Sequence, residues 1–197
     1  DAEQLVALRG DLRNFGFVMG LSTGVYQDLK QAELPVSGLG AYGEGSRKSL
    51  DDGSPIQLTA VSPDLFPTLG VTTAIGRVFS ADDLPNQGVI ISEHYWRAKL
   101  GARPDVLGQT LRIDDRAQPV IGVMPAGFRF PDAETDAWSV LDSSVTADDA
   151  GNVGNVEIIA RLAPDATHAA ALQALNQSLD RIAALDSLRT AAKLTGA

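Results

Sequence analysis

Residues 56–70 read IQLTAVSPDLFPTLG, and they predict a strand followed directly by a short helix. The first six residues alternate between two faces, which is the period of a half-buried strand. Ser62 suits the N-cap of a helix, and Gly70 suits the residue that ends it. Because Pro67 has no backbone N–H to donate, we expect this helix to be short or kinked.

Toward the N-terminus the sequence predicts three further elements. Residues 5–8 form a short apolar run that is typical of a strand. Residues 22–31 (STGVYQDLKQ) have helical periodicity, with Val25 and Leu29 on one face. A glycine-rich strand is predicted over residues 39–44.

Toward the C-terminus strands and helices follow one another. Residues 92–100 predict a helix that ends at Gly101, and residues 168–185 predict the clearest helix of the chain, with an apolar stripe at helical spacing. Strands are predicted over 88–91, 110–113, 119–124, 137–141 and 156–162, with Asp114, Asp115 and Arg116 joining the second to the third, and with a polar, glycine-rich linker over 146–154. This order predicts an α+β fold interrupted by a second, small α/β lobe.

Composition and charge exclude several classes of protein. The chain has 197 residues, of which 44% are hydrophobic and 21% charged, so we expect a packed core. Its net charge of −9 disfavours nucleic acid and anionic lipid as direct partners. There is no cysteine, which excludes disulfides, thiolate metal sites and a cysteine nucleophile. No apolar run approaches the ~20 residues that span a bilayer.

The motifs that could carry chemistry are weak. Gly38-Leu-Gly40-Ala-Tyr-Gly43 fits the spacing G-x-G-x-x-G, but a dinucleotide site needs a strand before it and a helix after it. A flexible or edge-strand glycine cluster is the preferred interpretation. We therefore predict no cofactor site.

The titratable residues also give no catalytic pattern. His94 and His168 are not at a metal-binding spacing, and we interpret both as surface or capping residues. Paired aspartates fall in predicted loops, where Asp favours turns. Nothing in the sequence marks two of them as facing one substrate, so no catalytic residue and no metal ligand is predicted; the pairs are Asp51-Asp52, Asp82-Asp83, Asp114-Asp115 and Asp148-Asp149.

Four stretches resemble one known family. AVSPDLFPTLGVTTAIGRVFSADD (60–83) and VIISEHYWRAKLGARPDVLGQTLRIDDRAQPVIGVMPAGFRFP (89–131) resemble the MacB-like periplasmic core domain of FtsX-like ABC transporter permeases. VEIIARLAPDATHAAALQALNQSLDRIA (156–183) is similar to its returning strand and helix, and YQDLK (26–30) to its early helix. The chain departs from the family pattern at Pro67, at the turn 114–115 and at 165–166.

The resemblance implies two lobes and a role without catalysis. One is a porter-like α/β sandwich built from 1–68 and 150–197, and the other is a small β-rich α/β lobe inserted at 69–149. The implied place is the periplasmic side of the inner membrane. The implied partners are the permease's transmembrane helices, a cytoplasmic ATP-binding subunit or domain, a second copy of the domain and a periplasmic adaptor. The family's structural residues fall here on glycines and aromatics, with Phe128 and Trp138 expected to fill the core of the insert.

Three functions follow as alternatives. The first is the transmission of conformational change from cytoplasmic ATP hydrolysis, with contact to a substrate or partner protein. The second is a module that binds a substrate or lipoprotein in a groove between the lobes, which would require a deep apolar cleft. The third is a hydrolase that uses paired aspartates, which would require two converging carboxylates with shifted pKa values.

Overall fold

The computed structural model describes residues 4–8, 10–12, 17–19, 21–83, 85–142 and 155–195. The chain divides into two compact units, one made of Asp1–Leu39 with Val145–Ala197 and the other of Gly40–Ser144. Each unit combines strands with helices, so the predicted α+β class is observed. The strand β5 (Val36–Gly43) begins in the first unit and ends in the second.

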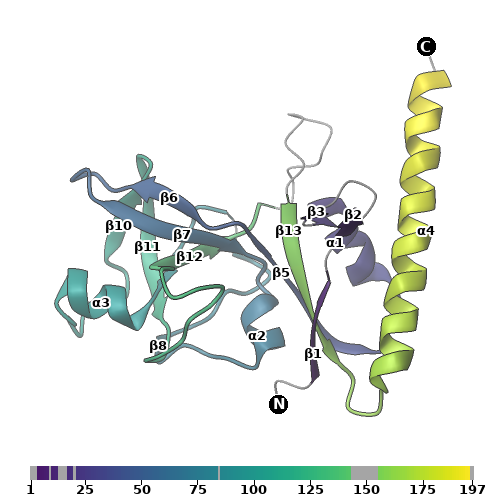
Figure 1. Ribbon diagram of the computed structural model, residues 1–197. Helices are drawn as coiled ribbons and strands as arrows, with labels where there is room; N and C mark the ends of the chain where they lie inside the picture. The colour runs from purple at the N-terminus through teal and green to yellow at the C-terminus, as the bar shows by residue number, and fades with distance from the viewer. Residues whose placement is uncertain are drawn as a thin grey trace. The chain divides into compact units, whose positions relative to one another are not determined.

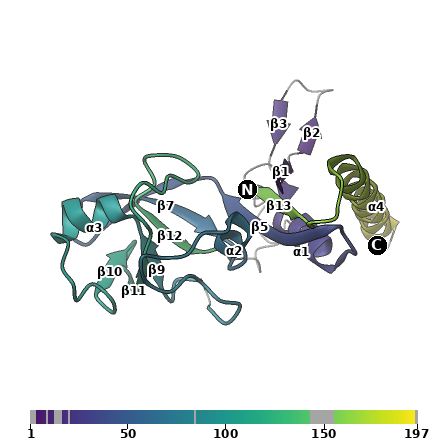
Figure 2. The ribbon, with the colours of Figure 1, turned by 90° about the horizontal axis from the view of Figure 1, so that it is seen from below.

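The first unit is built on a pair of antiparallel strands. β1 (Leu5–Leu8) pairs with β13 (Asn155–Leu162) in a register that sets Leu5 opposite Arg161. β4 (Leu21–Ser22) pairs with the other end of β13, and the Ser37 hydroxyl of β5 donates to the Leu162 carbonyl at 3.1 Å. β2 (Gly10–Leu12) and β3 (Phe17–Met19) form a separate two-stranded antiparallel sheet, labelled above β1 in Figure 2.

Two helices complete this unit. α1 (Thr23–Gln31) has Ser22 as its N-cap, whose hydroxyl accepts from the Val25 N–H at 3.2 Å. The helix α1 lies beside α4 (His168–Thr195), as Figure 1 shows. α4 extends ten residues beyond the predicted end at 185. The buried side chains of α1 and of the described part of α4 recur at helical spacing, as an amphipathic helix requires: Tyr26, Leu29, Ala171, Leu175, Ser178 and Ile182.

The second unit contains a mixed sheet whose strands follow one another in the order β6, β7, β12, β9, β11, β10. Figure 1 labels β6, β7, β12, β11 and β10 of this sheet, and Figure 2 labels β9. Two neighbouring pairs are parallel, β7 with β12 and β9 with β11, and the other pairs along this path are antiparallel. α2 (Leu65–Leu69) and α3 (Glu93–Leu100) belong to the same unit, and β8 (Ile75–Gly76) pairs with β11. The strands are β6 (Ser46–Ser49), β7 (Pro55–Val61), β9 (Val89–Ile91), β10 (Thr110–Ile113), β11 (Arg116–Val123) and β12 (Ala137–Val140).

The predicted N-cap of α2 is wrong. The Ser62 hydroxyl accepts from the Ala41 backbone N–H at 2.9 Å, because β5 passes beside the end of β7 and takes this oxygen. The N-cap position is held by Asp64, with no side-chain cap bond. The rest of the prediction is confirmed, since the helix has five residues and ends at Gly70, whose φ of 69° is left-handed.

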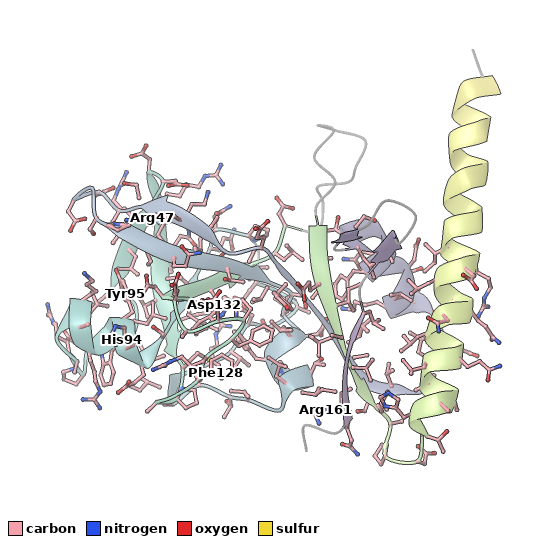
Figure 3. All side chains as sticks on the ribbon, viewed as in Figure 1. Arg47, His94, Tyr95, Phe128, Asp132 and Arg161 are labelled. Atoms are coloured by element: carbon pink, nitrogen blue, oxygen red, sulfur yellow. The ribbon has the colours of Figure 1, made fainter. Side chains whose placement is uncertain are left out.

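An aromatic cluster fills one side of this unit. The Trp138 ring is fully buried and meets Phe66 at 5.9 Å and Phe128 at 5.5 Å between ring centroids. The Trp138 indole N–H donates to the Phe130 carbonyl at 2.9 Å, which satisfies the polar atom of the buried ring. The expected core position of Trp138 is therefore confirmed, while Phe128 is only partly buried (Figure 3).

The backbones of β8 and β11 approach each other closely at Gly76 and Gly122, which lie opposite each other in the pairing of the two strands. A Cβ on Gly76 would lie 2.2 Å from the Ile121 carbonyl oxygen, and one on Gly122 would lie 2.6 Å from the Arg77 carbonyl oxygen. Gly76 also has φ +77°. Only glycine fits both places.

Two sequence predictions concern the chain at a larger scale. The linker over 146–154 lies outside the described residues. The lobe boundaries at 68/69 and 149/150 stay a prediction. None of the described helices is long and apolar enough to cross a membrane.

Candidate interaction site

Two β-hairpins meet at one end of the second unit. In the first, β10 and β11 are joined by a turn of only two residues, Asp114 and Asp115, with φ values of 46° and 63°. Positive φ at both positions is typical of the type I′ hairpin turn. The prediction that Arg116 belongs to this turn is therefore wrong, because the tight turn places Arg116 opposite Ile113 as the first residue of β11.

The second hairpin joins β6 to β7 through residues 50–54. The Leu50 N–H donates to the Ser54 carbonyl at 2.9 Å, and Gly53, with φ +76°, donates back to the Leu50 carbonyl at 2.8 Å. The Asp52 carboxylate accepts from both the backbone N–H and the hydroxyl of Ser54, at 2.9 and 2.6 Å. These bonds hold the turn in one conformation.

Contacts from both backbone and side chains tie the two hairpins together. Leu50 forms an isolated bridge with Ile113, and the Asp114 N–H donates to the Ser49 carbonyl at 3.0 Å. The ion pairs Lys48–Asp114, at 2.9 Å, and Arg112–Asp51, at 2.7 Å, also join the two hairpins. We call this junction of the two hairpins the seam. The first and last strands of the path, β6 and β10, thus meet at this end and close the sheet locally.

A groove of about 380 Å³ lies beside this seam, and we call it the hairpin groove. Its apolar lining comes from the hairpins and from α3, and Figure 3 shows Tyr95 pointing from α3 toward the strands. Its polar rim includes the exposed Lys99 ammonium. Among the described residues it is lined by Leu50, Asp51, Asp52, Ser54, Pro55, Tyr95, Lys99, Leu100, Thr110, Leu111 and Arg112.

A second, more polar hollow of about 700 Å³ is also lined by the Arg112–Asp51 pair. It shares Leu50, Asp51 and Arg112 with the hairpin groove. Its remaining lining is Ser49, Gly53, Asp114 and Asp115, so turn residues of both hairpins face it. With few apolar side chains, this hollow suits water better than a buried ligand.

The electrostatics of the hairpins keep the carboxylates charged. The Ser54 hydroxyl and N–H lower the pKa of Asp52, and the Lys48 ammonium followed by the Ser49 N–H lowers the pKa of Asp114. A general acid needs the opposite shift, so neither carboxylate is suited to donate a proton near neutral pH. Burial raises the pKa of Tyr95, with the negative charges of Asp136 and Asp52 adding to the effect.

The glycine motif 38–43 lies within β5 and does not form a phosphate-binding loop. No helix begins where the motif ends, since β6 follows it. A Cβ on Gly40 would lie 2.5 Å from the Cα of Leu65, so this glycine admits the close approach of α2. β5 has β13 and β7 as neighbours in the strand order, and its register with β7 sets Tyr42 opposite Val61. The interpretation as a flexible or edge-strand cluster stays a prediction.

The remaining sequence candidates are dispersed over the chain. His94 lies exposed in the first turn of α3, and His168 lies exposed at the start of α4. Among the described residues no three His, Asp or Glu side chains are grouped so as to hold a metal ion. Asp148-Asp149 lies outside these residues. The fold brings Asp51-Asp52 near Asp114-Asp115, a proximity that no sequence signal indicates.

The pair Asp82-Asp83 has a structural role. Asp83 makes a bidentate ion pair with Arg77, at 2.6 and 2.8 Å, and accepts from the Ser80 N–H at 2.7 Å. Hydrogen bonding by Arg77 is the main cause that lowers the pKa of Asp83 to about 2. This side chain pins the loop that follows β8.

Solved structures of similar fold come from transporters. The periplasmic region of MacB from Actinobacillus actinomycetemcomitans is 18% identical with a TM-score of 0.67, over 90% of this chain and 83% of that one. A domain assigned to a permease protein of Porphyromonas gingivalis is 21% identical with a TM-score of 0.64 over the same shares. The extracellular domain of the noncanonic ABC-type transporter YknZ from Gram-positive bacteria is 15% identical, with a TM-score of 0.56 over 80% and 81%.

At these identities the structures define the fold, and the sequence itself defines the family. Residues 4–178 match the family of MacB-like periplasmic core domains. The chain belongs to that family. No curated protein matches it in sequence.

Proposed function

We propose that this chain is the extracytoplasmic domain of an ABC transporter permease, and that it passes conformational change from cytoplasmic ATP hydrolysis to a substrate or partner protein without chemistry of its own. The observation that carries the proposal is the family match over residues 4–178. The domain would lie on the periplasmic side of the inner membrane. Its partners would be the permease's transmembrane helices, an ATP-binding subunit or domain, a second copy and a periplasmic adaptor.

The described side chains support a role in contact more than in catalysis. Two carboxylates at the hairpins, those of Asp52 and Asp114, have lowered pKa values and are held by lysine, serine and backbone donors. Their surroundings stabilise the charged form and leave no proton to give. The ordered hairpin seam with a groove beside it is the kind of surface that binds a partner.

The division into a porter-like lobe (1–68 with 150–197) and an inserted lobe (69–149) forms part of this proposal. In a permease, the lobe built from both chain ends would receive movement from the membrane, and the insert would present the contact surface. The β10–β11 hairpin lies within 69–149, whereas the β6–β7 hairpin precedes residue 69. The insert would therefore supply one of the two hairpins of the contact surface.

The attachment to a membrane is tested on the parent gene. We expect its reading frame to encode apolar stretches of ~20 residues before Asp1 and after Ala197. Flanks without such stretches would contradict the permease assignment whatever this domain binds.

Transmission is tested on the full-length transporter, in which this cysteine-free segment allows clean labelling. A single cysteine at the exposed Arg47 position of β6, and another at the exposed Gln173 position of α4, would be labelled with a maleimide with and without ATP. We expect the labelling rate at one position or both to change when ATP binds. Equal rates in both states would contradict transmission through this domain.

A further inference from the structure

β10 has a free edge that faces the hairpin groove. It is the last strand of the path, paired on one side with β11. The Val120 N–H donates to the Gln109 carbonyl at 2.8 Å, and the two-residue turn makes Ile113 and Arg116 the last hydrogen-bonded pair. Because bonding alternates along an antiparallel strand, Thr110 directs its N–H and C=O away from β11.

The partner of Thr110 in the register supports this orientation. Opposite Thr110 stands Pro119, which has no N–H to donate. Among the described residues, the bridge that joins β6 to β10 is at Ile113, at the far end of the strand. The peptide groups of Thr110 therefore lie at an open strand edge, and Thr110 itself is exposed and lines the groove.

The floor of the groove is apolar and continuous with the core. Leu50, Leu100 and Leu111 are partly buried and pack against the buried cluster that contains Tyr95 and Ile113. An open edge beside apolar side chains is the arrangement that accepts an added strand, in which main-chain bonds give affinity and alternate side chains enter pockets. A free volume of about 380 Å³ accommodates two or three side chains.

The charges around the groove differ from those of the whole chain. The two hairpins and α3 carry six cationic and five anionic side chains, a net of one positive charge in a chain of net charge −9: Arg47, Lys48, Arg97, Lys99, Arg112 and Arg116 against Asp51, Asp52, Glu93, Asp114 and Asp115. Arg112 and Lys48 are occupied by ion pairs, whereas Lys99 is exposed on the groove wall. An acidic side chain is thus repelled by the chain at large and attracted here.

We infer that the hairpin groove binds an extended segment of a partner protein, which adds as a strand to the edge of β10 at Thr110, places an apolar side chain against Leu111 and Leu100, and directs a carboxylate to Lys99. This inference rests on the proposed function, since it specifies how the domain would contact a protein partner. Peptide binding to the isolated chain is independent of membrane attachment and of ATP. Its failure is therefore distinguishable from failure of the permease assignment.

The probe is an acetylated and amidated peptide of about six residues, the length of one strand, with leucine and aspartate spaced two residues apart so that both face the groove. The backbone arm of the test compares Thr110→Pro with Thr110→Val in fluorescence anisotropy. Proline removes the outward N–H without breaking a bond to β11, while valine keeps that N–H. We expect Thr110→Pro to weaken binding about threefold to tenfold, and Thr110→Val to bind as the parent does.

The charge arm compares Lys99→Glu with Arg129→Glu, which makes the same change in net charge at an exposed position outside the groove. We expect Lys99→Glu to weaken the aspartate peptide about threefold to tenfold and to favour a matched lysine peptide. Arg129→Glu should leave the preference between the two peptides unchanged. An equal effect of both substitutions would show only long-range repulsion and would overturn the assignment of Lys99.

Hydrogen exchange on the unsubstituted chain tests the inference without relying on whether the variants fold. Hydrogen exchange of the Thr110 amide should slow in the presence of the aspartate peptide, because that N–H becomes hydrogen-bonded. Unchanged exchange at Thr110 under saturating peptide would overturn strand addition. No detectable binding of either peptide would overturn the inference as a whole.

Discussion

At the scale of single residues, this fold keeps several polar atoms buried without a partner. Within the described residues these are the Thr59 and Thr73 hydroxyls and the Gln118 amide oxygen. Thr59 and Gln118 are almost fully buried in the second unit, on β7 and β11. A buried polar atom that loses its water without gaining a bond destabilises the fold.

Replacing Thr59 by valine should therefore stabilise the protein. The substitution keeps the shape of the side chain and removes the unpaired hydroxyl, so we expect the free energy of unfolding to rise by about 1 kcal/mol. Thr135→Val is the control, because the buried Thr135 hydroxyl donates to Asp132 at 3.1 Å and its loss should lower that free energy by a similar amount. Urea denaturation measures both, and equal signs for the two variants would contradict the account.

Because of Asp83, the free energy of unfolding should depend on pH in the acid range. Its pKa is lowered from 3.8 to about 2 in the folded state, chiefly by Arg77. The folded protein thus binds this proton less readily than the unfolded chain, so the contribution of Asp83 is complete above about pH 4 and disappears as pH falls toward 2. We expect Asp83 to add about 1 kcal/mol to the free energy of unfolding at neutral pH. This is less than the full pKa shift implies, because Arg77 is half-exposed and water screens the pair.

Asp83→Asn provides the test, through unfolding curves recorded between pH 7 and pH 2. The difference in unfolding free energy from the parent should be largest at neutral pH and should vanish near pH 2. Asp105→Asn is the control, since its partner Arg103 is mostly exposed and the pair is screened by water. A difference for Asp83→Asn that persists at pH 2 would mean that shape, not charge, sets its role.

Residue types predicted some of these positions and missed others. Gly70 and Gly101 end their helices as predicted, because the requirement is local. Ser22 and Ser92, predicted as the first residues of their helices, are the N-caps one residue before them. Ser62 has the same chemistry, yet its hydroxyl bonds to Ala41, twenty-one residues away in the chain. A long-range competitor for one oxygen cannot be found from the residues beside it.

At the scale of secondary-structure elements, the β10–β11 hairpin is under backbone strain. Asp114 and Asp115 both have positive φ, which costs energy for any residue other than glycine. Asp114 also contacts Lys48 and Ser49 across the seam, whereas the Asp115 side chain makes no hydrogen bond or ion pair with the described residues. The two aspartates therefore respond differently to substitution.

Asp115→Gly should stabilise the hairpin by about 0.5–1 kcal/mol, because glycine adopts the required φ without strain. Asp114→Gly should gain less or lose stability, since it also removes the Lys48 ion pair and the Ser49 bond. Thermal unfolding monitored by circular dichroism compares the two. A lower melting temperature for Asp115→Gly would contradict the turn assignment.

The sequence predicted most of the strands and helices of both units but not the small strands. Alternation in 56–61 and helical spacing in 92–100 are long enough to identify. β6 (SRKS) has no apolar alternation, because its side chains are mostly exposed and only pairing with β7 makes it a strand. The hairpin groove depends on β6 and on the seam, so it could not be predicted.

At the scale of the whole molecule, charge limits where this chain can bind. A net charge of −9 disfavours anionic surfaces at neutral pH. We expect no co-sedimentation with vesicles that contain phosphatidylserine, at low salt or at physiological salt. Binding that weakens as salt is added would show a cationic face strong enough to overcome the net charge, and would contradict the expectation.

The α+β class could be predicted from the sequence, because the order of helices and strands along the chain reflects the architecture. A boundary between compact units inside β5 was not predicted. A strand that continues from one unit into another has uniform local composition, so nothing in its residues marks the change. The family signature identified the fold more fully than periodicity did, because it encodes contacts that no short window contains.

The pairing of β1 with β13 has a consequence for synthesis on the ribosome. Leu5 is opposite Arg161, so the first strand made waits for almost the whole chain before its partner exists. The strands from β6 to β12 arise within residues 46–140 and can assemble meanwhile. During that interval β1 is an apolar segment with unsatisfied backbone groups, and a nascent chain stalled there is the form most exposed to aggregation and to chaperones.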